Sequence, residues 1–281
     1  MGPSTLINRL LAPLGIKLSR GHPPDDNRAM YETLYSPQSL RDRRFYNVGA
    51  GSFRHPFWTN VDTPSDWYSA ERRHNIDIKW DMSSLSPLGV DDGVAEIVYC
   101  SHVIEHLLNE HVRHFFGEAY RILKPGGTIR ITCPDLLLVY EGYRRRNRFL
   151  LPREEETFSL QDRFMNFFAT QLTDIMRLNN PHGASATKLA DAEVDRLFAT
   201  LPFDAACDHI TALCNFDLQH KVPGAHINWW HFDKIGGFLR AAGFRTVRRS
   251  GYCQSLCPVM RNPAYFDNTV PQFSVYVEAE K

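Results

Sequence analysis

Glycines and carboxylates stand at the ends of predicted strands in the first third of the chain. Residues 44–48 run straight into Gly49-Ala50-Gly51, and glycines let backbone approach a ligand where a β-carbon would collide. Asp62 and Asp81 end the next two predicted strands. A carboxylate can accept hydrogen bonds from both hydroxyls of a ribose, and another can meet an adenine amino group. These residues predict one crevice for a nucleotide-type cofactor.

A second chemical cluster follows the fourth predicted strand, in the segment His102-Val-Ile-Glu105-His106. Histidines four positions apart share one face of a helix, so His102 and His106 could bind one metal ion. The same imidazoles could instead take a proton from an acceptor. The plainer interpretation is that Glu105 and His106 only border a substrate cleft.

The elements that must position these residues alternate along the chain. Apolar residues at helical spacing predict a helix over 102–123, which Lys124-Pro-Gly-Gly127 would end. Strands that alternate with helices favour an α/β fold with a doubly wound parallel sheet. The predicted strands cover residues 44–48, 58–62, 75–80, 95–100, 128–133, 244–249 and 273–279, and a further helix covers 233–242.

Between these parts lies a long stretch without strand signals. Residues 136–228 have helical patterns, and we expect them to form an insertion that covers the cleft and recognises the substrate. Trp229 and Trp230 could stack on a sugar or base, or pack in the core. Arginines at 144–146 and 148 could receive a phosphate, or form a solvated helix face. The expected organisation is an extension at 1–40, a cofactor-binding domain at 41–135 and 229–281, and the insertion at 136–228.

Three segments in this order resemble the class I S-adenosylmethionine-dependent methyltransferases, especially the type 11 group. They are Asn47-Val-Gly-Ala-Gly51, Ser101-His-Val-Ile-Glu-His-Leu107 and Arg121-Ile-Leu-Lys-Pro-Gly-Gly127. The resemblance covers about 45–135 and 231–281, and it implies a Rossmann-like sheet of seven strands whose last strand is antiparallel. It also implies S-adenosylmethionine as the cofactor.

The resemblance assigns roles to single residues. It implies that the glycine turn 49–51 lies under the methionine part of the cofactor and that Asp62 binds the ribose. It also implies that Asp81 and Met82 border the adenine and that Ser101 forms the wall beneath the sulfonium. The chain departs from the family pattern because Asn47 stands where an acid is usual and Phe53 where a third glycine is usual. Only eleven positions lead from Gly51 to Asp62, so the first connecting helix must be rudimentary. The implied cofactor-binding residues are Asn47, Gly49, Ala50, Gly51, Asp62, Asp81, Met82 and Ser101.

The expected reaction is O-methylation of a hydroxyl on a sugar, glycan or secondary metabolite. A hydroxyl is a poor nucleophile, so a base is expected; His102 and His182 are the first candidates, followed by His106 and Asp135. The segment 102–106 also resembles the divalent-ion site of small-RNA 2′-O-methyltransferases and ubiquinone-pathway O-methyltransferases. That resemblance implies His102, Glu105 and His106 as ligands, with His182 or His226 as a fourth.

Other functions stay open at this level. N-methylation of an amino sugar or small amine needs less help from a base, and a non-catalytic binding protein could keep the same fold. Lys and Arg number 32 and Asp and Glu 32, so no net charge attracts nucleic acid. The first residues lack the pattern of a signal peptide, and no apolar run is long enough to span a bilayer, which favours a cytoplasmic location. Leucines at 6, 10, 11 and 14 allow a peripheral membrane contact, and the oligomeric state is not encoded in any pattern we recognise.

Overall fold

The computed structural model describes residues 25–67, 69, 73–147, 151, 158–178 and 187–281. Its centre is a seven-stranded sheet in the order β3-β2-β1-β4-β5-β7-β6. All neighbouring strands are parallel except β7, which runs antiparallel to both β5 and β6. This confirms the Rossmann-like sheet with an antiparallel last strand. The strands are β1 (Phe45–Val48), β2 (Trp58–Asp62), β3 (Ile78–Lys79), β4 (Ala95–Ser101), β5 (Leu123–Pro134), β6 (Thr246–Ser250) and β7 (Ser274–Glu280).

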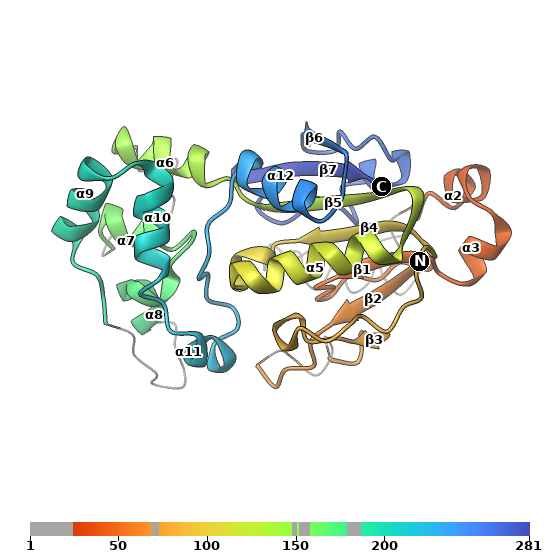
Figure 1. Ribbon diagram of the computed structural model, residues 1–281, viewed down its shortest axis with the longest axis horizontal. Coiled ribbons are helices and arrows are strands. Elements are labelled where there is room, and N and C mark those ends of the chain that lie inside the picture. Colours follow the sequence, from red (N-terminus) through yellow and green to blue (C-terminus); the bar gives the residue numbers. More distant parts are fainter. Residues whose placement is uncertain (1–24, 68, 70–72, 148–150, 152–157, 179–186) are drawn as a thin grey trace, which may run out of the picture.

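Two helices cover one face of the sheet, α5 (Asn109–Ile122) and α12 (Phe232–Ala241) (Figure 1). Successive side chains of a strand point to opposite faces, so Val98 and Cys100 of β4 face this layer. Tyr99, between them, faces the other layer. There the sheet packs against α2 (Arg28–Leu34) and the 3-10 turn η5 (Pro258–Arg261), with α3 (Pro37–Arg41) leading into β1.

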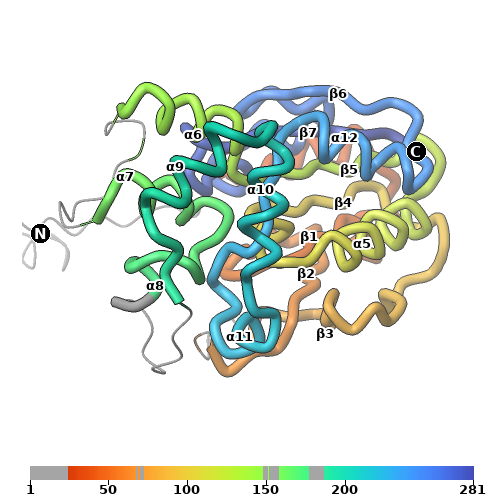
Figure 2. Tube along the Cα trace, turned by 60° about the vertical axis from the view of Figure 1, so that its left-hand side comes forward, coloured from red at the N-terminus to blue at the C-terminus, as the bar shows by residue number. Residues whose placement is uncertain are grey.

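The stretch after β5 is helical, and it lies beside the edge of the sheet where the parallel strands end (Figures 1 and 2). It has a core of its own, in which Phe164, Phe168 and Trp229 are buried. The described residues between β5 and α11 are therefore mainly helical, and the bounds 136–228 of a substrate-recognition insertion stay a prediction. Its helices are α6 (Leu136–Arg144), α7 (Leu160–Met165), α8 (Asp174–Leu178), α9 (Asp191–Thr200), α10 (Phe203–Thr211) and α11 (Phe216–Lys221), with a 3-10 turn η4 (Thr170–Leu172).

The predicted helix over 102–123 is wrong at its start. His102 has a left-handed backbone (φ 53°), residues Ile104–His106 form the 3-10 turn η3, and α5 begins only at Asn109. His102 and His106 therefore do not share a face of an α-helix. The remaining 3-10 turns are η2 (Met82–Ser84) and η6 (Pro271–Phe273).

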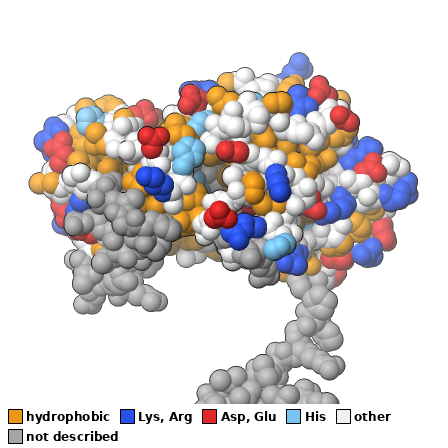
Figure 3. All heavy atoms as spheres, turned by 90° about the horizontal axis from the view of Figure 1, so that it is seen from below, with side chains coloured by type: hydrophobic (Ala, Val, Ile, Leu, Met, Phe, Trp, Pro, Cys, Tyr) orange, Lys and Arg blue, Asp and Glu red, His pale blue; other side chains and the backbone are white. Residues whose placement is uncertain are grey.

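The surface carries charges of both signs. Figure 3 shows basic and acidic side chains interspersed over one face, as the balanced composition leads one to expect. Among the residues that the structure describes, none of the helices is long and apolar enough to cross a membrane.

Candidate functional site

A cavity of about 810 Å³ opens where the parallel strands end. Its wall combines the ends of β1, β2 and β4 with α11 of the insertion and with four residues of the β6–β7 connection, Ala264, Tyr265, Asn268 and Thr269. Cavities of this size suit a nucleotide cofactor together with a small acceptor. The wall includes every cofactor-binding residue expected from the sequence, namely Asn47, Gly49, Ala50, Gly51, Asp62, Asp81, Met82 and Ser101.

The glycine turn has the backbone that only glycine adopts easily. Gly49 and Gly51 have φ of 74° and 55°, and a β-carbon added to Gly49 would lie 2.1 Å from Cγ2 of Val103. Asp62 holds this turn, because its Oδ2 accepts a hydrogen bond from the backbone N–H of Gly51 at 2.9 Å. Its Oδ1 accepts another from the N–H of Thr63 at 2.8 Å. A carboxylate has further lone pairs, so Asp62 can still accept bonds from hydroxyls in the cavity.

The two departures from the family pattern leave the cavity open. Asn47 is buried and contributes an uncharged amide to the wall. Phe53 packs its ring against Trp58 and Phe266, with centroids 5.7 and 5.6 Å away, in the core on the far face of the sheet. At the opposite end Asp81 is exposed and accepts bonds from Ser83, whereas Met82 is buried.

His102 lies at the end of β4 and forms part of the wall. Its side chain is only 11% exposed, and its Nδ1 lies 3.2 Å from Oε1 of Glu105. Its Nε2 lies 2.8 Å from the hydroxyl oxygen of Ser274, at the start of β7. The backbone N–H of His102 donates to the carbonyl of Thr132. The ring contacts with Glu105 of η3 and with Ser274 of β7 fix the imidazole at the cavity.

Glu105 is 1% exposed, and neither of its carboxylate oxygens has a hydrogen bond of good geometry. Burial by itself raises the pKa of this carboxyl, but the contact with His102 and the charges of His106 and His226 outweigh it and hold the pKa at about 2. Glu105 is therefore a buried carboxylate whose nearest partners are imidazoles.

His226, from the insertion, completes this cluster. Its ring lies 4.8 Å from that of His106, and its Nε2 lies 4.0 Å from Oε1 of Glu105. The ligand atoms of Glu105, His106 and His226 all lie within 4.8 Å of one another, a spacing that a metal ion could bridge. Burial lowers the pKa of His226 to about 4, which keeps its imidazole neutral as a ligand must be. This group contains Glu105, His106 and the possible fourth ligand His226 but not His102, and the expected set of His102, Glu105 and His106 stays a prediction.

One expected candidate among the described residues is not brought to the cavity. Asp135 does not belong to its wall; the carboxylate accepts a hydrogen bond from Arg249 at 2.8 Å, so its expected role as a base is not supported by its position. His182 lies outside the described residues. Trp229 and Trp230 are 3% and 1% exposed, so they pack in the core rather than present a face to a ligand.

The wall also contains residues that sequence reasoning missed. Phe216, Gln219 and His220 come from α11, and Tyr265 and Asn268 from the β6–β7 connection. No local motif singles them out. The only signal was the run of Asn, Pro and aromatic residues over 261–271, to which the sequence alone assigns no role.

Comparisons with known proteins agree with this geometry. Residues 58–131 match the family described as "Methyltransferase domain". A "Probable S-adenosylmethionine-dependent methyltransferase" of Mycolicibacterium smegmatis is 28% identical over 144 residues, which is 47% of this chain and 52% of that protein. The match thus spans about half of that relative's length.

Solved structures of S-adenosylmethionine-dependent methyltransferases can also be superposed on the chain. One from Mesorhizobium loti gives a TM-score of 0.41 at 13% identity, covering 90% of this chain and 96% of that one. One from Archaeoglobus fulgidus gives 0.40 at 12% identity, covering 100% and 95%.

Proposed function

We propose that this chain, a class I S-adenosylmethionine-dependent methyltransferase by its fold and by its match over residues 58–131, binds S-adenosylmethionine in the cavity and transfers the methyl group to a bound acceptor. The observation that carries the proposal is the convergence of the eight motif residues on one cavity, with Asp62 bonded to the glycine turn. The ribose would lie on Asp62, with the methionine part over the turn.

Asp62 provides the direct test. We expect Asp62→Asn to weaken binding of S-adenosylmethionine in calorimetry by about tenfold or more, because an amide accepts fewer and weaker bonds from ribose hydroxyls than a carboxylate does. Asp91→Asn changes an exposed residue outside the wall and is the matched control. Absence of binding by the unchanged protein would favour a non-catalytic binding protein on this fold.

For the acceptor we propose a hydroxyl of a sugar, glycan or secondary metabolite, with His102 as the base. The methyl group leaves sulfur for the acceptor oxygen, and the hydroxyl proton passes to the imidazole. His102 supports this assignment because it lies in the wall next to Ser101, with Glu105 and Ser274 orienting its ring. Glu105 would stabilise the imidazolium that forms. His106, also in the wall, is the second candidate.

N-methylation of an amine is the alternative reaction at the same cavity. An unprotonated amine attacks the sulfonium without a base, so it would tolerate loss of the histidines. Turnover with candidate acceptors separates the two reactions. Substitution of His102 by Gln should abolish most O-methylation and leave N-methylation within a few-fold of its original rate.

A divalent metal ion is a further candidate, favoured by the two imidazoles whose nitrogens lie close to the buried carboxylate of Glu105. Glu105, His106 and His226 would hold the ion, and two imidazoles with one carboxylate suit a borderline metal such as Zn²⁺ better than Mg²⁺. Such an ion lowers the pKa of a bound hydroxyl. His106 lines the cavity, so this group has access to an acceptor there.

A further inference from the structure

The connection between β6 and β7 covers a part of the sheet that a helix between β1 and β2 would otherwise cover. No helix links β1 to β2, because residues 49–57 form only turns and extended chain. The sheet face beside this link is covered instead by Val259, Met260 and Phe266 of the β6–β7 connection, which pack with Phe45 and Trp58. Chain that is distant in sequence thus fills the space beside the glycine turn.

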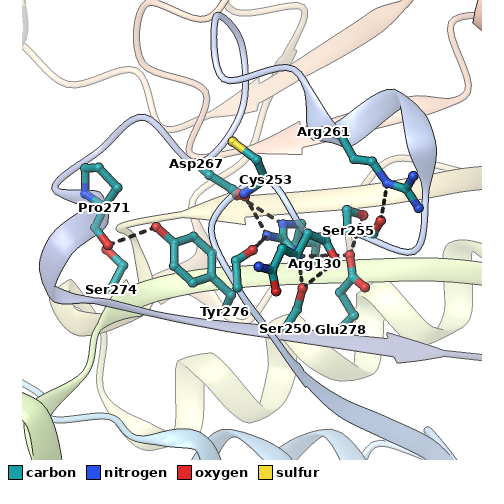
Figure 4. Close-up of polar contacts among 12 residues, drawn as sticks. Arg130, Ser250, Cys253, Ser255, Arg261, Asp267, Pro271, Ser274, Tyr276 and Glu278 are labelled. Carbon is teal, nitrogen blue, oxygen red and sulfur yellow. Dashed lines mark hydrogen bonds and ion pairs between the residues drawn. The ribbon is translucent and has the colours of Figure 1, made fainter.

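A buried ion cluster fixes this connection to the sheet (Figure 4). Arg130 of β5 is 0% exposed and donates to Asp267 through Nε at 3.0 Å and Nη2 at 2.5 Å. Its Nη1 donates to Glu278 of β7, the residue opposite it in the sheet, at 2.9 Å. Glu278 also accepts bonds from Ser255 and from the backbone N–H of Leu256. Two ends of the connection are therefore held on one arginine-centred network.

Asp267 connects the buried ion cluster to the wall of the cavity. Its backbone N–H donates to the hydroxyl of Tyr99 at 2.8 Å, and Tyr99 is the sheet neighbour of Asn47. Tyr265, two positions before Asp267, and Asn268, directly after it, belong to the cavity wall. The Tyr265 ring lies 6.1 Å from that of Phe53, which follows the glycine turn. Tyr265 thus lies beside the chain that follows the glycine turn, and Asn268, three residues further on, lies in the same cavity wall.

We propose that Tyr265 and Asn268 bind the amino-acid end of S-adenosylmethionine. This inference rests on the proposed function, which places the ribose on Asp62 and the methionine part over the glycine turn. The methionine part carries an ammonium and a carboxylate, and Asn47 offers only a neutral amide to them. The amide of Asn268 can accept from the ammonium and donate to the carboxylate, and the Tyr265 hydroxyl can do either. The β6–β7 connection would add polar contacts to those of the short β1–β2 link, whose Ser52 and Arg54 also line the cavity.

The test compares two nucleosides that differ only in this part. S-adenosylhomocysteine has the amino-acid end, whereas 5′-methylthioadenosine lacks it. We expect Asn268→Ala and Tyr265→Phe each to weaken binding of S-adenosylhomocysteine about tenfold in calorimetry, because hydrogen bonds to charged groups are lost. Binding of 5′-methylthioadenosine should change less than twofold. Tyr252→Phe, an exposed tyrosine of the same connection, is the matched control and should change neither affinity.

The outcomes separate this inference from the function on which it rests. If the unchanged protein binds neither nucleoside, the proposed function fails, and the inference fails with it. If it binds both and the two variants leave the affinity for S-adenosylhomocysteine unchanged, or weaken both nucleosides equally, the inference alone is overturned. Thermal unfolding of each variant checks that the fold is retained, and a second substitution, Asn268→Asp, keeps a polar side chain there if the alanine variant does not fold.

Discussion

Gly49 and Gly51 have the same left-handed backbone but different surroundings. Any residue with a β-carbon is strained at such φ values, so both positions favour glycine. Only at Gly49 would the β-carbon also meet a neighbour, because Val103 packs against the turn there. Nothing lies within 4 Å of a β-carbon on Gly51. The first glycine is therefore required for packing and for backbone, and the second for backbone alone.

We therefore expect Gly49→Ala to be the more damaging of two matched substitutions. Gly51→Ala should lower the free energy of unfolding by about 1 kcal/mol through backbone strain alone. Gly49→Ala should lower it by about 3 kcal/mol, because the clash with Val103 adds the cost of overpacking. Urea titrations of both variants provide the comparison. Equal losses would contradict the packing of Val103 against Gly49.

The Glu105 cluster leads to a second prediction at the scale of single residues. If Glu105, His106 and His226 bind an ion, Zn²⁺ at a hundred times its dissociation constant should stabilise the protein by about 2.7 kcal/mol. The melting temperature would rise accordingly, and a chelator would reverse the rise. His226→Ala should abolish the effect, whereas His209→Ala, at an exposed position, should not. A shift that survives in His226→Ala would exclude this set of ligands.

At the scale of elements, Arg130 is the residue that joins β5, β7 and the β6–β7 connection. It is fully buried with two carboxylates, Asp267 and Glu278, and such groups are stable in the interior only while they are paired. The ring of Tyr276 lies 5.2 Å from the guanidinium and covers it. The position of one wall of the cavity depends on this single side chain.

Arg130→Met should therefore destabilise the protein strongly. The substitution leaves the carboxylates of Asp267 and Glu278 buried without a cation, which costs about 3–5 kcal/mol. Arg245→Met, at an exposed position just before strand β6, should cost less than about 0.5 kcal/mol. Chemical denaturation gives both values. A loss below about 1 kcal/mol for Arg130→Met would contradict a buried ion cluster.

At the scale of the whole molecule, we expect the free energy of unfolding to depend on pH through His55. It is 7% exposed, and burial lowers its pKa to about 4, well below the ordinary value near 6.5. Its Nδ1 accepts a hydrogen bond from the N–H of Phe57, and its Nε2 contacts the carbonyl of Asp26, so the folded state fits a neutral ring. As pH falls from 6.5 to 4, the unfolded chain gains a proton here that the folded chain does not.

The sign of this linkage predicts a loss of stability on acidification. The neutral histidine contributes nothing to the pH dependence above about pH 6.5, and the fold loses about 3 kcal/mol through this group as pH falls to 4. His55→Gln should remove that part of the slope, whereas His209→Gln, at an exposed site, should keep it. Unfolding free energies measured at several pH values give the slopes, and an unchanged slope in His55→Gln would refute the prediction.

What the sequence by itself determined is the local part of the site. Gly49, Gly51, Asp62 and Ser101 lie at or next to strand ends, and the carboxyl ends of parallel strands meet at one edge of a sheet. A correct assignment of strands was therefore enough to bring them together. The antiparallel last strand did not follow from the local pattern; it was implied by the resemblance to the methyltransferase family, and the structure confirms it.

Only the tertiary structure decided the rest. His226 joins Glu105 from a position 121 residues further along the chain, and Tyr265 and Asn268 reach the glycine turn from more than 200 residues away. No local pattern encodes such contacts. The left-handed backbone of His102 escaped prediction because the apolar spacing of a helix continues through Val103 and Leu107, whereas contacts with Glu105, Thr132 and Ser274 hold the chain in a turn.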